Sequence, residues 1–154
     1  MTQNNFPFPS DGKRYYTWNR YLRNEFGKKV YKVALDAGFD CPNRDGTVAF
    51  GGCTFCSAAG SGDFAGNKVD PIPVQFEKIK TKMESKWKDG LTMAYFQAYT
   101  NTHAPLEVLK EKFEAALACE GVMGLSIATR PDCLPDDVVE YLAELNERTY
   151  LWVE

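Results

Sequence analysis

The sequence predicts an α/β protein with a parallel sheet whose strands are connected by helices. Short apolar segments alternate along the chain with longer segments in which apolar residues recur every three or four positions. These are the patterns of buried strands and of helices with one apolar face. Residues 91–99 are apolar on both faces, as in a central parallel strand. The repeated order of strand, loop and helix favours βα units.

The N-terminal part of the chain predicts a lead-in, a helix and a strand. Residues 1–12 contain two prolines and a glycine and predict an irregular segment. Residues 15–26, followed by a glycine, predict a helix, and the apolar residues 30–35 predict the first strand. We therefore divide the chain into an N-terminal extension with a basic and aromatic helix (1–27) and a core (28–154).

The rest of the chain continues the alternation. Apolar residues at helical spacing predict three further helices, within residues 76–87, 105–117 and 135–145. The segments between and after them predict three strands, 91–99, 122–128 and 150–153. Three and a half βα units do not close a barrel, and the chain ends inside the fourth strand. We therefore expect the N-terminal part of a longer core, truncated in strand 4.

The composition predicts a soluble, cytoplasmic protein without a membrane partner. No apolar run reaches the roughly 18 residues that span a bilayer. The first nine residues lack the basic and apolar segments of a secretory signal. Five cysteines, an odd number, favour a reducing compartment over a disulfide framework.

The net charge of −3 conceals a basic segment near the N-terminus. Residues 13–32 contain seven Lys or Arg against one acid, Glu25, with six aromatic residues between them. Cations beside stacking rings are typical of a nucleic-acid surface. The same pattern is also that of an amphipathic helix with aromatic residues in the core and solvated lysines. Both interpretations remain open from the sequence.

The most informative feature is a long glycine-rich loop that carries three cysteines. Residues 38–66 hold seven of the twelve glycines, and Cys41, Cys53 and Cys56 lie within them. The loop follows the first strand, at the sheet edge where α/β proteins form their sites. Three soft ligands suit a metal centre with one open position. The loop is therefore expected to be functional.

Three cysteines can hold three irons of a 4Fe-4S cluster, which leaves the fourth iron free to chelate an amine and a carboxylate. S-adenosylmethionine offers such a pair, and its reductive cleavage releases a 5′-deoxyadenosyl radical. The alternatives are inert cysteines and a zinc site completed by one of three other residues. Those residues are His103, Cys119 and Cys133.

Other residues near the same edge have two interpretations each. Arg130 ends the third predicted strand and can clamp a cofactor carboxylate, or it can pair with Asp132. His103, the only histidine, is a candidate proton donor or metal ligand, or it simply precedes a helix. Cys133 can take a radical or substrate role, whereas Cys119 is expected to be a small buried residue.

Four segments carry a family resemblance. They are residues 38–46 (GFDCPNRDG), 52–56 (GCTFC), 95–102 (YFQAYTNT) and 126–132 (SIATRPD). In these segments the chain resembles the radical S-adenosylmethionine superfamily, and within it the YtqA/YhcC group related to the catalytic subunit of elongator. The similarity runs over nearly the whole chain, from Lys13 to Glu154.

The resemblance implies the N-terminal portion of a partial (β/α)6 TIM-like barrel, with a 4Fe-4S cluster on the three cysteines. It implies that Phe55 lies against the adenine of S-adenosylmethionine. The usual Gly-Gly-Glu after the second strand is absent, so Gln97 and Asn101 are assigned to the methionine end. The first two cysteines are also farther apart than the three residues usual in the superfamily, although elongator-like members share a longer gap.

The function implied is radical chemistry in tRNA modification at the wobble uridine, with electrons from a flavodoxin- or ferredoxin-type donor. Two rival hypotheses remain. One is a non-catalytic zinc-binding RNA-binding module, and the other is an inactive barrel fragment without metal or cofactor. The basic residues 13–32 are compatible with either RNA-binding hypothesis.

Overall fold

Four parallel strands form the centre of the structure, a computed structural model that describes residues 13–154. The elements in chain order are α1 (Trp18–Phe26), β1 (Val30–Leu35), α2 (Ile72–Glu84), β2 (Leu91–Phe96), α3 (Leu106–Leu117), β3 (Val122–Ile127), the 3₁₀ helix η2 (Pro131–Cys133), α4 (Asp136–Arg148) and β4 (Tyr150–Val153). The strands lie side by side in chain order, each parallel to the next. The predicted α/β class is confirmed. The predicted lead-in over residues 1–12 lies outside the described residues.

Several predicted boundaries shift for local reasons. The first helix begins at Trp18, not at residue 15, because the Thr17 side chain accepts a hydrogen bond from the Arg20 N–H and caps the helix. The second strand was predicted to residue 99 but ends at Phe96. The helix before it was predicted to reach Trp87 but ends at Glu84, and Trp87 instead packs on the core from the following turn.

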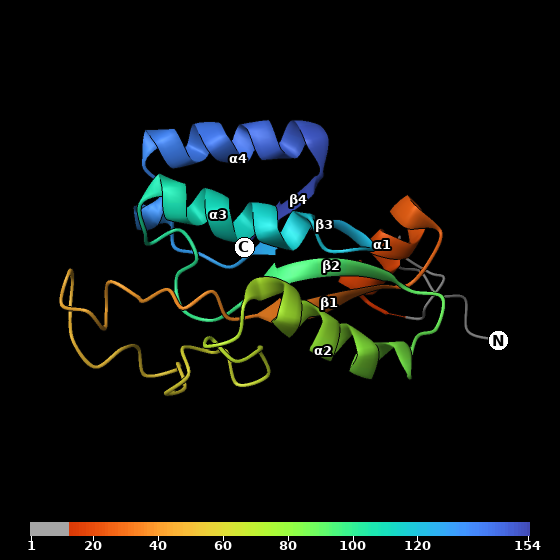
Figure 1. Cartoon of the computed structure of the whole chain (residues 1–154), viewed down its shortest axis with the longest axis horizontal. Helices are drawn as coiled ribbons and strands as arrows, with labels where there is room; N and C mark the ends of the chain where they lie inside the picture. The colour runs from red at the N-terminus through yellow and green to blue at the C-terminus, as the bar shows by residue number, and fades with distance from the viewer. Residues whose placement is uncertain (1–12) are drawn as a thin grey trace.

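One face of the sheet packs against α2, α3 and α4. Alternate strand residues point to this face, and with helix side chains they form the main buried cluster. Its largest fully buried members include Leu35, Phe76, Phe96, Leu109, Phe113, Leu125, Ile127 and Leu145. Figure 1 shows α3 and α4 on one side of the strands and α2 beside β1 and β2. Burial of these side chains supplies the main stabilisation of the fold.

The opposite face of the sheet changes character along the strands. Near the strand beginnings it is apolar, because Leu22 of α1 packs on Val30 and Met93. Further along it carries Lys32, in the middle of β1, whose Nζ lies 2.6 Å from a carboxylate oxygen of Glu154 and 3.8 Å from the centre of the Tyr95 ring. A polar half-face is unusual in a parallel sheet, which is normally covered by apolar side chains on both sides.

The two ends of the sheet differ as well. The long loop between β1 and α2 projects from the end where the strands finish, at the left of Figure 1, and α1 lies at the other end. The loop therefore stands at the carboxyl edge of a parallel sheet, where α/β proteins place their sites. Among the residues from 13 onward, no helix is long and apolar enough to cross a membrane.

Candidate metal and cofactor site

A buried glutamine of α2 holds the two ends of the long loop together. Gln75 is 1% exposed, and its side-chain oxygen accepts a hydrogen bond from the Asp36 N–H at 2.9 Å. Its amide group donates to the backbone oxygens of Asp36 and Asp70, also at 2.9 Å. Because these three hydrogen bonds join one buried side chain to both ends of the loop, Gln75 helps to fix where the loop leaves and rejoins the fold.

The middle of the loop is bonded to the chain that follows β2. The Tyr99 N–H donates to the Gly60 oxygen at 2.9 Å, and the Thr100 N–H donates to the Asp40 oxygen at 3.2 Å. Gly60 has a φ of 59°, and a Cβ there would meet the Tyr99 ring at 2.5 Å. Only glycine suits this approach. Tyr99 itself has a φ of 62°, a strained conformation for a non-glycine residue.

These contacts enclose a cavity of about 300 Å³ that all three loop cysteines line. Its lining residues come from the loop and from the ends of β2 and β3: Cys41, Arg44, Cys53, Phe55, Cys56, Gly60, Ser61, Tyr95, Gln97, Tyr99, Thr100, Ala128, Thr129 and Arg130. The structure thus brings together six of the seven residues predicted for the site. The exception is Asn101.

Each of the three sulfur atoms has a polar neighbour. The Asn43 side-chain amide donates to the Cys53 sulfur at 3.0 Å, and the Cys56 sulfur lies 3.5 Å from the Ser61 hydroxyl. One guanidinium nitrogen of Arg130 lies 4.0 Å from the Cys41 sulfur. Donors around a sulfur stabilise a thiolate and tune a metal bound to it.

The electrostatic environment favours ionisation of Cys41. Its partial burial raises the pKa of the thiol, but hydrogen bonds from Thr100, the Asn43 backbone and Arg130 together outweigh burial. The net effect is a lowered pKa for Cys41. A thiolate is the form that acts as a metal ligand or nucleophile.

Arg44 is a residue of the site that the sequence interpretation missed. Its guanidinium donates to the Ser57 oxygen and lies 5.5 Å from the centre of the Tyr99 ring. The Cys56 side chain raises the pKa of this guanidinium. A Cβ at Gly52 would lie 2.9 Å from the Arg44 side chain, so the glycine leaves room for it. The sequence signal that could have identified Arg44 was a cationic residue between Cys41 and Cys53.

The remaining predicted cavity residues keep distinct environments. Arg130 forms a two-point ion pair with Asp132, at 2.8 and 2.6 Å, which is the main cause of its raised pKa. The predicted pairing with Asp132 is thus confirmed; Arg130 also lines the cavity, where its clamp on a cofactor carboxylate stays a prediction. The Gln97 amide donates to the Ser61 oxygen at 2.8 Å. Phe55 is 87% exposed at the cavity rim.

Asn101 is placed differently from the prediction. It is fully buried, and its amide donates to the backbone oxygens of Phe96 and Ala128, at 3.0 and 2.9 Å. It thereby ties together the ends of β2 and β3, as a second donor to two carbonyl groups that also accept backbone hydrogen bonds. Its side-chain oxygen has no hydrogen-bond partner among the residues the structure describes. This position supports a structural contribution of Asn101, not contact with a ligand in the cavity.

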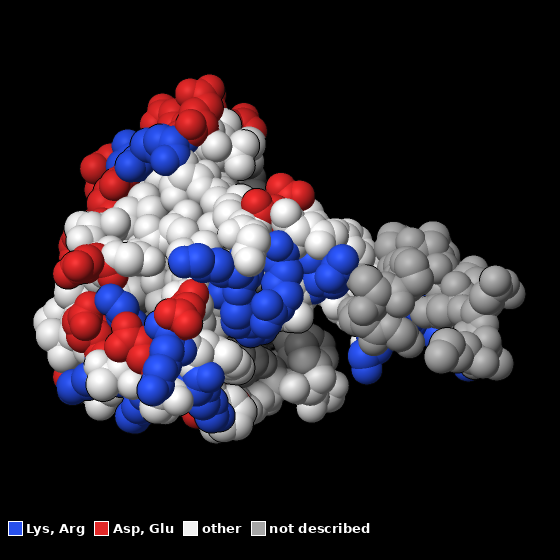
Figure 2. Space-filling model, turned by 90° about the vertical axis from the view of Figure 1, so that its right-hand side faces the viewer, with Lys and Arg blue, Asp and Glu red and all other residues white. Residues whose placement is uncertain are grey.

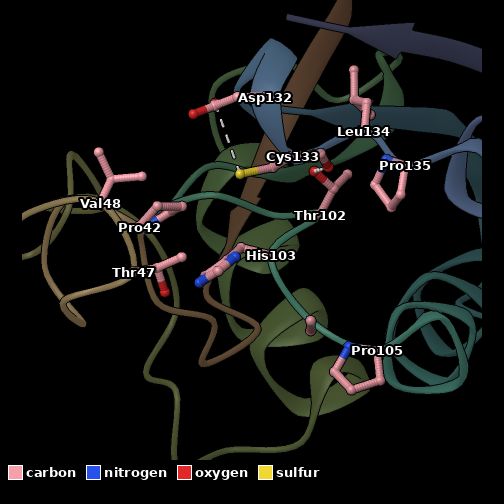
Figure 3. A pocket seen from close by; sticks show the side chains of 11 residues that line it. Pro42, Thr47, Val48, Thr102, His103, Pro105, Asp132, Cys133, Leu134 and Pro135 are labelled. Carbon is pink, nitrogen blue, oxygen red and sulfur yellow. Dashed lines mark hydrogen bonds between the residues drawn. The ribbon is translucent and has the colours of Figure 1, made fainter.

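A second cavity, of about 670 Å³, lies on the other side of the chain after β2 (Figure 3). Its walls include His103 and Cys133, two of the three residues considered for completing a zinc site. His103 pairs with Asp45 at 2.6 Å. The pKa of Asp45 is lowered to about 2, first by the Thr47 backbone N–H and then by the side chains of Thr47 and His103.

None of the three candidate zinc-completing residues lines the cavity of the loop cysteines. The third of them, Cys119, is the residue two positions beyond α3, and its thiol donates to the Ala115 oxygen. Within residues 13–154, no group of three or more His, Cys, Asp or Glu side chains is arranged to hold a metal ion. The loop cysteines thus surround a cavity without converging on one point.

Comparison with known proteins gives relatives whose names state no function. The chain is 72% identical over 155 residues to the uncharacterized protein YtqA of Bacillus subtilis, covering 100% of this chain and 48% of YtqA. It is 39% identical to YhcC of Escherichia coli K12, covering 86% of this chain and 42% of YhcC. It is 36% identical to the uncharacterized protein MJ0486 of Methanocaldococcus jannaschii, covering 94% of this chain and 44% of the relative.

The chain therefore spans less than half the length of these relatives. No family model matches it. No solved structure matches it either.

Proposed function

We propose that the chain is the N-terminal part of a radical S-adenosylmethionine enzyme in which Cys41, Cys53 and Cys56 ligate a 4Fe-4S cluster. The observation that carries the proposal is that three cysteines of one loop line one cavity at the carboxyl edge of a parallel sheet. When bound, such a cluster supplies the electron that cleaves S-adenosylmethionine to a 5′-deoxyadenosyl radical.

The residues around the cavity fit this donor set. A structural zinc ion needs four protein ligands, and none of the three residues considered as a fourth ligand lines this cavity, whereas three thiolates suffice for a 4Fe-4S cluster with one open iron. Asn43 and Ser61 lie within hydrogen-bond reach of the Cys53 and Cys56 sulfurs, and Arg130 lies near the Cys41 sulfur. Such contacts lower the cost of gathering three negative thiolates.

The same cavity offers groups for the cofactor. Arg130 uses Nε and one Nη on Asp132, and its other Nη, 4.0 Å from the Cys41 sulfur, has a second N–H that could bind the carboxylate of S-adenosylmethionine. Gln97 supplies a neutral polar group in the same cavity, and Phe55 an exposed ring for the adenine. These residues would bind and orient the cofactor.

The proposal extends to a partial (β/α)6 barrel. The strands occur in the order β1-β2-β3-β4 without a reversal. Doubly wound sheets reverse their strand order at the binding site, whereas barrels do not. The polar half-face with Lys32 and Glu154 would then lie inside the barrel, next to the cavity.

For partners we propose a tRNA substrate, modified at the wobble uridine, and a flavodoxin- or ferredoxin-type electron donor. Reductive cleavage requires an electron from outside the protein, which supports the donor. The basic residues 13–32 support a polyanionic substrate.

Anaerobic reconstitution with iron and sulfide tests the proposal. We expect about four irons and four sulfides per chain, and 5′-deoxyadenosine after reduction with S-adenosylmethionine present. Cys53→Ala should lose the iron, whereas Cys119→Ala, a matched change outside the cavity, should keep it. A colourless protein with one zinc per chain and tight, salt-sensitive RNA binding would instead identify the non-catalytic RNA-binding module.

A further inference from the structure

A basic hollow lies at the end of the sheet opposite the cysteine cavity. Arg23, Lys28, Lys29 and Lys88 line it, in a space of about 340 Å³ between the end of α1 and the turn before β2. These four residues are called the basic patch below. Figure 2, which faces the end where α1 lies, shows Lys and Arg gathered there.

The charges of the basic patch are not neutralised within the described part of the chain. None of its four side chains forms an ion pair there, although Asp89 also lines the hollow. Burial, and then the neighbouring Arg23, lower the pKa of Lys29, as expected where like charges gather. An anionic ligand would remove this repulsion.

Part of the basic patch is held in position. The Lys29 ammonium donates to the Asn19 side-chain oxygen at 2.7 Å and lies 5.3 Å from the centre of the Trp87 ring. The Trp87 ring in turn stacks on Tyr31 at 5.7 Å. A cation fixed before binding loses less conformational entropy when it meets a phosphate.

The packing of α1 argues against a membrane surface as the ligand. A helix that lies in a membrane interface inserts its apolar face into the lipid. Here Leu22 is 2% exposed, and it packs with Phe26 on the sheet. The apolar side of α1 is thus already covered, and its charged end is what remains for a partner.

We infer that the basic patch binds the phosphate backbone of an RNA. The identification of the ligand as an RNA rests on the proposed function, whereas the expectation of an anionic ligand rests on the charges of the basic patch itself. A six-residue strand separates the patch from the cysteine cavity by about 20 Å, or about six base pairs along a duplex. One folded RNA can therefore contact the patch while presenting a nucleotide near the cavity.

The test measures binding of labelled bulk tRNA to the protein at several salt concentrations. Four phosphate contacts give a slope of log affinity against log salt of about −3 to −4. The variant R23Q/K28Q/K88Q removes three exposed charges, and we expect it to weaken binding at least tenfold and to reduce the slope by about 2 to 3. Unchanged binding, or no tRNA binding by the unmodified protein, would overturn the inference.

The matched control is K78Q/K110Q/K112Q, which removes the same net charge. Each of these lysines is paired with a carboxylate, so the control should retain tRNA binding. Equal loss in both variants, or tighter binding to anionic lipid vesicles than to tRNA, would also overturn the inference. Circular dichroism reports the fold, and iron content is measured on the same proteins. Loss of RNA binding with iron retained thus separates this inference from the proposed function.

Discussion

Two cavities at the same edge of the sheet hold cysteines in opposite environments. Cys41, in the smaller cavity, lies near Arg130, and hydrogen bonds lower the pKa of its thiol despite partial burial. Cys133, in the larger cavity, is 7% exposed and lies beside Asp132. Its burial, followed by the charge of Asp132, raises the pKa of its thiol.

The contrast shows that the identity of the neighbours determines what a cysteine at this edge can do. One arginine–aspartate pair serves both cavities, because the guanidinium of Arg130 approaches Cys41 and the carboxylate of Asp132 approaches Cys133. Cys41 therefore favours the thiolate form that binds metals, and Cys133 favours the neutral thiol. This difference motivates the predictions that follow.

The largest difference is expected in iron binding. Cys41→Ala removes one of three proposed ligands, so reconstituted protein should retain little or none of the roughly four irons per chain. Cys133→Ala should retain all of them. Equal iron content in the two variants would contradict the proposal that the smaller cavity holds the cluster and the larger one does not.

The next prediction concerns the metal-free protein. The thiolate is the reactive form, so Cys41, with its lowered pKa, should be alkylated by iodoacetamide at lower pH than an ordinary cysteine. Cys133 is buried with a raised pKa and should react about 100-fold more slowly at pH 7. Mass spectrometry of timed samples measures both rates. Comparable rates would contradict the predicted difference in reactivity between the two thiols.

Asn101 lies in the chain segment between the two cavities, and its replacement should affect the fold. Asn101→Ala removes two hydrogen bonds to the Phe96 and Ala128 oxygens, each of which keeps a backbone donor, and this loss should destabilise the protein by about 1–3 kcal/mol. Urea unfolding measures the change. Gln97→Ala, in the cavity wall, should leave stability nearly unchanged. The opposite outcome, a stable Asn101→Ala that fails to bind S-adenosylmethionine, would restore the sequence-based role.

Arg130→Met tests the shared ion pair. Without the guanidinium the pKa of Cys41 should rise, and its alkylation at pH 7 should slow about three- to tenfold. Asp132→Asn keeps the guanidinium and should leave Cys41 reactive. If Arg130→Met reacts at the original rate, the proximity of Arg130 has no electrostatic effect on Cys41.

The smallest effect is expected at the His103–Asp45 pair of the second cavity. His103→Gln removes one of several contributions to the lowered pKa of Asp45, so the melting temperature should fall by less than about 2 °C at pH 5. A carboxyl group whose pKa is lowered by folding stabilises the fold at pH values above its pKa in the unfolded chain. This stabilisation is lost as the pH falls towards the folded-state pKa of about 2. The difference between the two proteins should therefore disappear in acid.

The regular elements were largely predictable from the sequence. The strands over residues 30–35 and 150–153 coincide with β1 and β4, because short apolar segments bounded by turns have few other solutions. The end of β2 was not predictable. Residues 97–99 continue its apolar pattern, yet Tyr99 turns away to bond with Gly60, a residue of the distant loop.

The candidate site likewise has features that were predictable from the sequence and features that were not. The three cysteines were recognisable because ligand type and spacing are local properties of the sequence. Arg44 was missed, and the surroundings of Asn101 were not foreseen, because they depend on which backbone oxygens and rings the fold brings near these residues. A polar residue after a strand can serve a ligand or the strand end itself, and only the packing distinguishes these uses.

The most direct test of the central claim is electron paramagnetic resonance of the reconstituted, dithionite-reduced protein with and without S-adenosylmethionine. If Cys41, Cys53 and Cys56 leave one iron open, the reduced cluster should give a signal whose position shifts when the cofactor is added. A protein that binds zinc in place of iron, or a cluster signal that S-adenosylmethionine does not change, would contradict the claim.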